Sequence, residues 1–116
     1  MNCDQTIEVP GQAREGAIGI RLPYFVYILA SRPHGAIYVG STRDLRNRVE
    51  QHRSGAVSGH TRKYQIHTLV WFEIHEEWEF ARLREHRIKR WRRTWKNEMI
   101  EAQNSGWRDI CDWIPY

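Results

Sequence analysis

The segment from Tyr24 to Ala30 constrains the fold most, because its apolar side chains do not alternate with polar ones. Alternate residues of a strand point to opposite faces of its sheet. One face of this segment would carry Phe25, Tyr27 and Leu29, and the other would carry Tyr24, Val26 and Ile28. A strand with apolar residues on both faces is covered on both faces, so the sequence predicts a central strand.

A second strand is predicted from Ala36 to Val39, after a turn formed by Arg32-Pro33-His34-Gly35. The hairpin brings Tyr27 and Tyr38 from adjacent strands and ends in Gly40, just before a predicted helix. Polar side chains that meet at one sheet edge are typical of active sites, but such hairpins are also common without any catalytic role. The two tyrosines are therefore candidate site residues with both interpretations open.

The remaining elements follow from caps and periodicity. Ser41 or Thr42 can cap a helix that has Asp44 in its first turn and Leu45 and Val49 facing the core. This helix ends near Arg53, before a basic loop at 54–63. A third strand at 66–74 and helices at about 76–90 and 93–103 complete the expected domain. Asn104 is placed to cap the last helix, and Trp107 and Ile110 are expected to pack back onto the domain.

The length of 116 residues, with 41% hydrophobic residues, suits one domain, which we place at 23–110. Residues 1–22 are expected to be a mobile extension, and residues 111–116 a tail. No apolar run approaches the roughly 20 residues of a membrane helix. The expected protein is therefore soluble and cytoplasmic, with no membrane partner. Cys3 and Cys111 lack the spacing of a zinc site and do not support a disulfide framework.

Positive charge is concentrated in one segment. The formal net charge is +4, and Arg84–Lys96 contains seven of the 18 Lys and Arg residues against a single acid, Glu85. Such uneven basicity favours a polyanionic partner. Trp91 and Trp95 lie among these cations, so the segment could bind nucleic acid by stacking and phosphate contact. The spacing of four favours the other interpretation, in which both tryptophans belong to the core and the arginines are solvated. The candidate nucleic-acid contacts are Arg46, Lys63, Arg90, Arg92, Arg93 and Lys96.

Two further patterns carry candidate chemistry. Asp44, Arg48 and His52 recur at intervals of four, either as a solvated face or as a guanidinium and an imidazole suited to holding a phosphodiester. Glu85 interrupts an otherwise apolar helical stripe that includes Ala81. A half-buried acid is costly unless it is paired or bound to a metal. Glu85 is therefore either in a salt bridge with Arg48 or another arginine, or a lone carboxylate ligand for Mg²⁺.

The order of these motifs resembles the GIY-YIG nuclease domain. The resemblance rests on Val26-Tyr27-Ile28, Tyr38-Val39-Gly40, an arginine eight residues after Gly40, a histidine four residues further on, and the helix around Glu85. It extends from Tyr24 to Ile110 and is strongest to the small stand-alone bacterial members of that superfamily. The first motif reads Phe25-Val26-Tyr27 in place of Gly-Ile-Tyr, and Val39 replaces an isoleucine. Neither difference removes a reactive group.

The resemblance implies an α/β (α+β) fold with a small, mainly antiparallel three-stranded sheet flanked by helices. It also implies phosphodiester hydrolysis with one divalent metal, Mg²⁺ or Mn²⁺, held by Glu85. Carried onto this chain, Tyr27 is the general base, Tyr38 is a second hydrogen-bonding group and Arg48 holds the scissile phosphate. His52 orients water or phosphate, or shares the role of base. Gly40 and Asn104 are supporting residues.

Two functions remain open from the sequence. The first is a metal-dependent endonuclease that acts on nucleic acid, with DNA as the expected substrate, selects structure rather than sequence, and serves DNA repair or recombination. The second is a catalytically silent nucleic-acid-binding module of the same fold. A protein-interaction domain with incidental basicity is a weaker third hypothesis, and the sequence does not define the oligomeric state.

Overall fold

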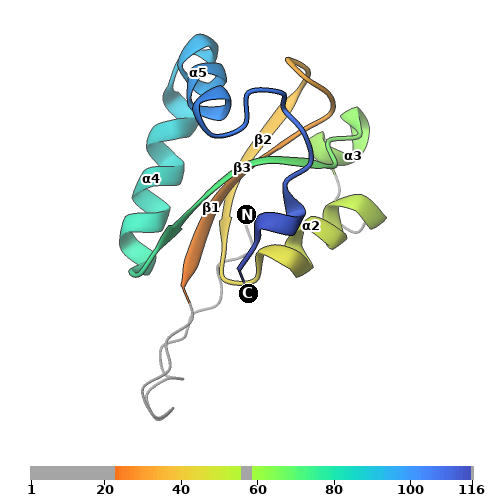
Figure 1. Ribbon diagram of the computed structural model, residues 1–116. Coiled ribbons are helices and arrows are strands. Elements are labelled where there is room, and N and C mark those ends of the chain that lie inside the picture. The colour runs from red at the N-terminus through yellow and green to blue at the C-terminus, as the bar shows by residue number, and fades with distance from the viewer. Residues whose placement is uncertain (1–22, 56–58, 116) are drawn as a thin grey trace.

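The fold is built on a small antiparallel sheet whose central strand is the apolar segment at 24–30. The computed structural model describes residues 23–55 and 59–115. Strands β1 (Tyr24–Ala30), β2 (Ile37–Thr42) and β3 (Thr68–His75) form a 3-stranded sheet in the order β2-β1-β3, and β1 is antiparallel to both neighbours (Figure 1). The predicted α+β architecture and the central position of β1 are confirmed. The expectation for residues 1–22 lies outside the described residues.

Helices cover both faces of the sheet. Helices α4 (Trp78–Arg90) and α5 (Arg93–Gln103) lie on one side of it (Figure 1). Helices α2 (Leu45–Ser54) and α3 (His60–Tyr64) and the 3-10 helix η2 (Cys111–Trp113) lie on the other. Within the described ranges, no helix has the length and apolar character needed to cross a membrane.

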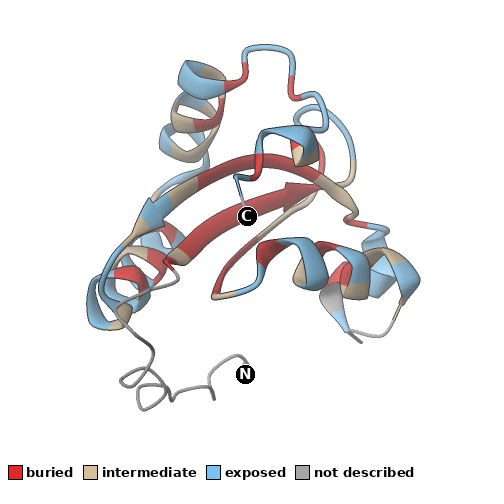
Figure 2. Ribbon diagram, turned by 60° about the horizontal axis from the view of Figure 1, so that its bottom comes forward, coloured by how far each residue is buried: buried red, intermediate tan, exposed pale blue. Residues whose placement is uncertain are grey.

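Each face of β1 contributes to its own hydrophobic core, which explains why its sequence is apolar throughout. Phe25, Tyr27 and Leu29 pack with α2 residues such as Leu45 and Val49. The alternate residues of β1 pack on the other face with apolar residues of α4 and α5. Figure 2 shows β1 buried along almost its whole length. Each fully buried aliphatic or aromatic side chain contributes about 1.5–3 kcal/mol, so β1 fixes the layers on both sides.

The start of α2 differs from the prediction. Strand β2 continues through Ser41 and Thr42, and the N-cap is Asp44, whose Oδ1 accepts a hydrogen bond from Asn47 N at 3.2 Å. Thr42 Oγ1 instead accepts from Asp44 N at 3.1 Å and shapes the approach to the helix. Pairing of Thr42 with Phe25 across the sheet outweighs the capping preference of its hydroxyl. The predicted end is confirmed, because Gly55 closes α2 at a φ of 81°.

The segment predicted as a basic loop at 54–63 contains the first residues of α3. That helix ends at Gln65, whose φ of 54° turns the chain toward β3. Ile66 is buried but precedes the strand, which begins at Thr68 rather than at 66. Helix α4 likewise begins two residues later than predicted, after the N-cap Glu77. Apolar periodicity marks burial here better than it marks element boundaries.

The free edge of β3 is covered by the chain that follows α5. The Gln103 side-chain amide bonds both backbone groups of Phe72, accepting from N at 3.2 Å and donating to O at 2.9 Å. Asn104 Nδ2 donates to Val70 O at 3.1 Å, and Ile110 N donates to Leu69 O at 2.9 Å. These bonds satisfy backbone groups that an edge strand would otherwise leave open for pairing with another chain.

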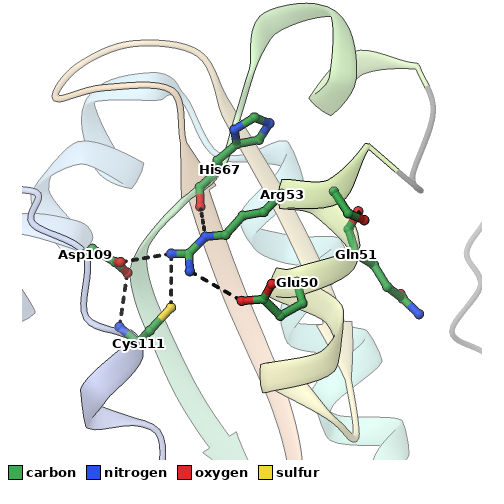
Figure 3. Close-up of polar contacts among 7 residues, drawn as sticks. Glu50, Gln51, Arg53, His67, Asp109 and Cys111 are labelled. Carbon is green, nitrogen blue, oxygen red and sulfur yellow. Dashed lines mark hydrogen bonds and ion pairs between the residues drawn. The ribbon is translucent and has the colours of Figure 1, made fainter.

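The C-terminal segment is tied to α2 by Arg53 (Figure 3). Its Nε donates to His67 O at 3.1 Å, and its Nη2 contacts Asp109 Oδ2 at 2.9 Å and Cys111 Sγ at 3.3 Å. Burial and the hydrogen bond to Asp109 raise the pKa of Cys111 to about 11, so this thiol remains protonated at neutral pH. Ile114, in the predicted tail, is buried in the core on the α2 side.

Candidate active site

Tyr27, Tyr38 and His52 meet on the face of the sheet that α2 covers. Tyr27 lies on β1, Tyr38 on β2 and His52 in the last part of α2. The Tyr27 hydroxyl and His52 Nε2 are 3.4 Å apart. The Tyr38 ring centroid lies 6.2 Å from that of Tyr27 and 5.0 Å from that of His52. The structure therefore brings these predicted site residues together.

Gly40 makes the position of Tyr27 possible. It pairs with Tyr27 across β1 and β2, and the tyrosine ring lies over the space where a side chain of residue 40 would begin. A Cβ at Gly40 would lie only 2.6 Å from Tyr27 Oη and 3.0 Å from Tyr38 Cε2. The glycine is needed here for close approach rather than for an unusual φ angle.

His52 is a buried neutral base. The residue is only 1% exposed. Burial and the nearby positive charges of Arg48 and His67 lower its pKa to about 4. Within the described part of the chain its Nδ1 has no hydrogen-bond partner, so Tyr27 is its hydrogen-bonding contact. Arg48 is half-buried and lies one turn before His52 on α2, so that its positive charge acts on the imidazole.

Glu85 approaches from the opposite face of the sheet. It lies on α4, is 8% exposed, and its Oε1 accepts a hydrogen bond from Ser41 Oγ at 2.5 Å. Its Oε2 forms an ion pair with Lys89 Nζ at 2.6 Å, while Arg82 Nε lies 3.9 Å from Oε1. The expected burial on an apolar stripe is confirmed. One of the two interpretations from the sequence, a salt bridge to an arginine, is met by Arg82, and Lys89, one turn further along α4, forms a closer ion pair.

The two groups of residues meet at β2. Gly40 and Ser41 are consecutive, so one faces Tyr27 and the other faces Glu85. Strand β2 is an edge strand, with β1 as its only strand neighbour in this sheet. The candidate site is therefore the edge of the sheet at β2, with tyrosines and imidazole on one face and a carboxylate on the other.

The donor set at Glu85 fits a single hard cation. In the described ranges no group of three or more His, Cys, Asp and Glu side chains is arranged to hold a metal. Mg²⁺ needs no such group, because it is commonly held by one or two carboxylates, with waters and substrate phosphate as the other ligands. The Lys89 ammonium shows that the position beside Oε2 accepts a cation, and the Lys89 side chain is 47% exposed to solvent.

Asn104 has a structural position. It is buried at the C-terminus of α5, which confirms its predicted capping role. Its side chain bonds the backbone of Val70 and both the N and O of Arg108. Val70 is the extra residue where the register between β1 and β3 shifts, so Asn104 satisfies a carbonyl at an irregular point of the sheet. The structure places it against β3 rather than at β2.

The predicted nucleic-acid contacts divide into two groups. Arg90, Arg92, Arg93 and Lys96 lie together where α4 meets α5. Two of them also have structural contacts, since Arg93 Nη2 donates to Gly35 O at 2.5 Å and Lys96 Nζ donates to Lys89 O at 3.2 Å. Arg46 and Lys63 lie on the other side of the sheet, where Arg46 donates to Ile114 O at 2.8 Å and Lys63 lies over Tyr64.

The tryptophans of the basic segment differ from each other. Trp91 is half-buried and packs against the core on the α4 and α5 side. Trp95 is 48% exposed and contacts the Trp91 ring at a centroid distance of 6.0 Å. The interpretation favoured from their spacing, that both belong to the core, is therefore wrong for Trp95.

Sequence reasoning missed Ser41 and Lys89 as partners of Glu85. The signal for Lys89 was its position four residues after Glu85, where helical side chains are neighbours. Ser41 was considered only as a helix cap. Its position directly after Gly40 on a strand would have placed it on the face opposite the tyrosines.

Residues 23–98 match the family model described as the GIY-YIG catalytic domain. The chain therefore belongs to the GIY-YIG family, a class of nuclease-type domains. More specifically, its curated relatives are UPF0213 proteins, small stand-alone members of that family. It is 32% identical to the UPF0213 protein of Clostridium perfringens over 80 residues, which cover 69% of this chain and 85% of the relative. It is 33% identical to that of Haloquadratum walsbyi over 78 residues, covering 67% and 86% of the two chains.

Among solved structures, the chain is similar to the solution NMR structure of a UPF0213 protein from Bacillus halodurans. The two are 26% identical, with a TM-score of 0.48, and the similarity covers 78% of this chain and 95% of that one.

Proposed function

We propose that this protein is a metal-dependent endonuclease that cleaves DNA at sites selected by structure rather than by sequence. The observation that carries the proposal is that consecutive residues of β2 adjoin the two groups: Gly40 lies against Tyr27, which contacts His52, and Ser41 donates to Glu85 on the other face. Phosphodiester hydrolysis needs a proton acceptor for the attacking water and positive charge at the phosphate. The residues around β2 provide the first, and Arg48 with a cation at Glu85 would provide the second.

Tyr27 is assigned as the group that accepts the proton of the attacking water, and His52 positions it. A tyrosine hydroxyl has a reference pKa of about 10 and is a weak base at neutral pH unless nearby positive charge lowers that pKa. The neutral His52 ring can accept a hydrogen bond from the Tyr27 hydroxyl at Nε2, which leaves the oxygen lone pairs of Tyr27 for the attacking water. Tyr38 contributes a second hydroxyl to the same group, and Arg48 binds the scissile phosphate.

Glu85 is assigned as the protein ligand of Mg²⁺ or Mn²⁺. When bound, such an ion supplies positive charge for the phosphate and the leaving oxygen. Ser41 fixes the orientation of the Glu85 carboxylate through Oε1, so that Oε2 is the oxygen offered to the cation. Lys89 must leave Oε2 for this to happen.

The contacts of Glu85 also favour a second candidate function, a catalytically silent nucleic-acid-binding module. Both carboxylate oxygens have protein partners, Ser41 and Lys89. A carboxylate whose two oxygens already have protein partners can stabilise the fold without binding a metal ion. In that case the protein would bind DNA in the presence of a chelator, with an affinity that falls as salt rises, and would cleave nothing.

The test is cleavage of supercoiled plasmid, single-stranded DNA and branched DNA with Mg²⁺, Mn²⁺ or chelator. We expect metal-dependent cleavage that Glu85→Gln abolishes, because the neutral amide keeps the shape of the side chain but is a poor ligand for a hard cation. Glu98→Gln changes an exposed glutamate of α5 and is the matched control. Equal cleavage by the wild type and Glu85→Gln would overturn the metal assignment. Binding without cleavage by either protein would establish the silent module.

A further inference from the structure

Trp95 lies beside a group of cations and is 48% exposed to solvent. The Arg92 guanidinium lies over the Trp95 ring, with Cζ 5.0 Å from the ring centroid. The Trp91 ring meets Trp95 edge to face, at an interplanar angle of 82°. These two contacts hold the Trp95 ring in place while much of its surface remains accessible.

The packing of α5 does not explain a tryptophan at this position. Ile100 is the residue that α5 buries in the core. Trp95 precedes it by five residues, which places the two side chains about 140° apart around a helix with about 3.6 residues per turn. Packing in the core therefore does not require an aromatic ring with about half of its surface in solvent at this position. The exposed indole, with a guanidinium over its ring, is available to a ligand.

The surroundings of Trp95 favour an anionic ligand. Arg92 is exposed over its ring, Arg90 is exposed at the end of α4, and Arg93 and Lys96 lie on the first turn of α5. Burial and the positive charge of Arg93 lower the pKa of Lys96, which is consistent with the crowding of cations on this surface. An aromatic ring surrounded by arginine and lysine matches the chemistry of a nucleotide, which has a flat base and a charged phosphate.

This surface is continuous with the candidate active site along α4. Trp91 follows Glu85 by six residues, which corresponds to about 9 Å along a helix axis. Lys89 joins the two regions, because its Nζ contacts Glu85 Oε2 at 2.6 Å and its carbonyl accepts from Lys96 Nζ at 3.2 Å. A DNA strand held at Glu85 could therefore extend along Lys89 toward the surface that carries Trp95.

We propose that Trp95 and Arg92 form a stacking site for an unpaired base of single-stranded DNA, with Arg90 and Lys96 contacting the adjoining phosphates. The proposal rests on the proposed function, because it takes the nuclease substrate as its ligand. In a duplex both faces of a base are already stacked, so only an unpaired base can lie on an exposed indole ring. This site would make the enzyme prefer single-stranded or frayed segments.

The test measures the binding of fluorescein-labelled dT12 and of a 12-base-pair duplex by fluorescence anisotropy, in chelator so that no cleavage occurs. Because Trp95→Ala loses stacking on one base, its affinity for dT12 should fall about tenfold or more. Its affinity for the duplex should change by less than about twofold. Trp95→Phe, which keeps an aromatic face, should restore most of the dT12 affinity. The matched control is Trp113→Ala, because Trp113 is 52% exposed but lies in η2 on the other side of the sheet.

The proposal is overturned if Trp95→Ala binds dT12 as tightly as Trp113→Ala and the wild type. It is also overturned if Trp95→Ala weakens dT12 and duplex binding equally, since that indicates loss of general affinity. Thermal unfolding of each variant identifies any loss that comes from folding. The plasmid assay with Glu85→Gln is independent of these outcomes. If the wild type cleaves DNA but Trp95→Ala binds dT12 normally, only the stacking site is rejected. If Trp95→Ala selectively loses dT12 binding but the wild type cleaves nothing, only the nuclease is rejected.

Discussion

The contact between Gly40 and Tyr27 predicts a large effect from a single methyl group. In Gly40→Ala the new Cβ would lie 2.6 Å from Tyr27 Oη and 2.8 Å from Tyr27 Cζ, so the ring must move away from β2. We expect a loss of about 1–3 kcal/mol in the free energy of unfolding, as is usual for an overpacked site, measured by urea denaturation. Cleavage by the folded variant should fall because the hydroxyl is displaced.

Gly106→Ala is the matched control for this change. A Cβ at Gly106 would meet its nearest neighbour, Arg108 Cγ, at 3.6 Å, which is an ordinary van der Waals contact. Its stability should change by less than about 0.5 kcal/mol, as for most surface substitutions. If Gly40→Ala were as stable and active as Gly106→Ala, the proposed position of Tyr27 over Gly40 would be wrong.

His52 predicts a pH dependence of stability. Its pKa is about 4 in the folded protein against 6.5 for the free side chain. Between these two values the imidazole binds a proton in the unfolded chain but not in the folded chain. The contribution of His52 to the free energy of unfolding is therefore fully present above pH 6.5 and decreases as pH falls toward 4. We expect the stability difference between the wild type and His52→Gln, which cannot titrate, to shrink over this range by roughly 1–2 kcal/mol.

Urea midpoints at several pH values between 7 and 4 would measure this difference. His86→Gln is the control, because it replaces an exposed imidazole on α4, on the other side of the sheet from His52. A difference between the wild type and His52→Gln that does not vary with pH would show that the imidazole is charged or solvated in the folded protein.

At the scale of elements, the sequence predicted what depends on burial and missed what depends on competition between local signals. The apolar residues of β1 placed it at the centre of the sheet, and Leu45 and Val49 identified the inner face of α2. The start of α2 could not be predicted, because Thr42 can either cap a helix with its hydroxyl or continue a strand. Backbone pairing with Phe25, which is distant in the sequence, keeps Thr42 in the strand.

Asn104 gives a prediction at this scale, because it joins the end of α5 to β3. Asn104→Ala removes the donor to Val70 O and both bonds with the Arg108 backbone, and leaves buried polar groups without partners. We expect a loss of about 1–3 kcal/mol in the free energy of unfolding. Asn104→Asp should be at least as unstable, since a carboxylate cannot donate to Val70 O.

Activity separates this structural role from the supporting catalytic role that the family resemblance implies for Asn104. If the role is structural, cleavage per folded molecule should remain within about twofold of the wild type, because the side chain contacts β3 and not β2. Asn47→Ala, at an exposed position in α2, serves as the stability control. A large fall in cleavage with unchanged stability would restore Asn104 to the active site.

At the scale of the whole molecule, the candidate site depends on how three layers meet at one edge strand. Tyr27 and His52 belong to the layers on one face, and Glu85 belongs to the helix on the other. Helical spacing identified Glu85 as unusual within α4. It could not show that Ser41 and Lys89 would hold its carboxylate more closely than an arginine does, because that depends on where α4 crosses β2. Residue chemistry was predictable, whereas the partners set by packing were not.

The attachment of the C-terminal segment to α2 provides a prediction for the whole molecule. Arg53 holds together the last turn of α2, the residue before β3 and the chain after α5, through His67 O, Asp109 and Cys111 (Figure 3). Since α2 also carries Arg48 and His52, loosening this attachment should affect the candidate site. We expect Arg53→Met to lower the free energy of unfolding by about 1–3 kcal/mol, because the His67 carbonyl loses its charged donor.

A double-mutant cycle with Asp109→Asn divides this loss between the partners of Arg53. The ion pair between Arg53 and Asp109 is partly solvated, so its coupling energy should be about 0.2–1 kcal/mol. Most of the loss in free energy of unfolding caused by Arg53→Met should therefore remain when this substitution is made in the Asp109→Asn background. Limited proteolysis should cut the segment after Ile110 sooner in Arg53→Met than in Arg62→Met, which changes an exposed arginine of α3. Equal proteolysis of the two variants would show that burial of Ile114, rather than Arg53, keeps this segment on α2.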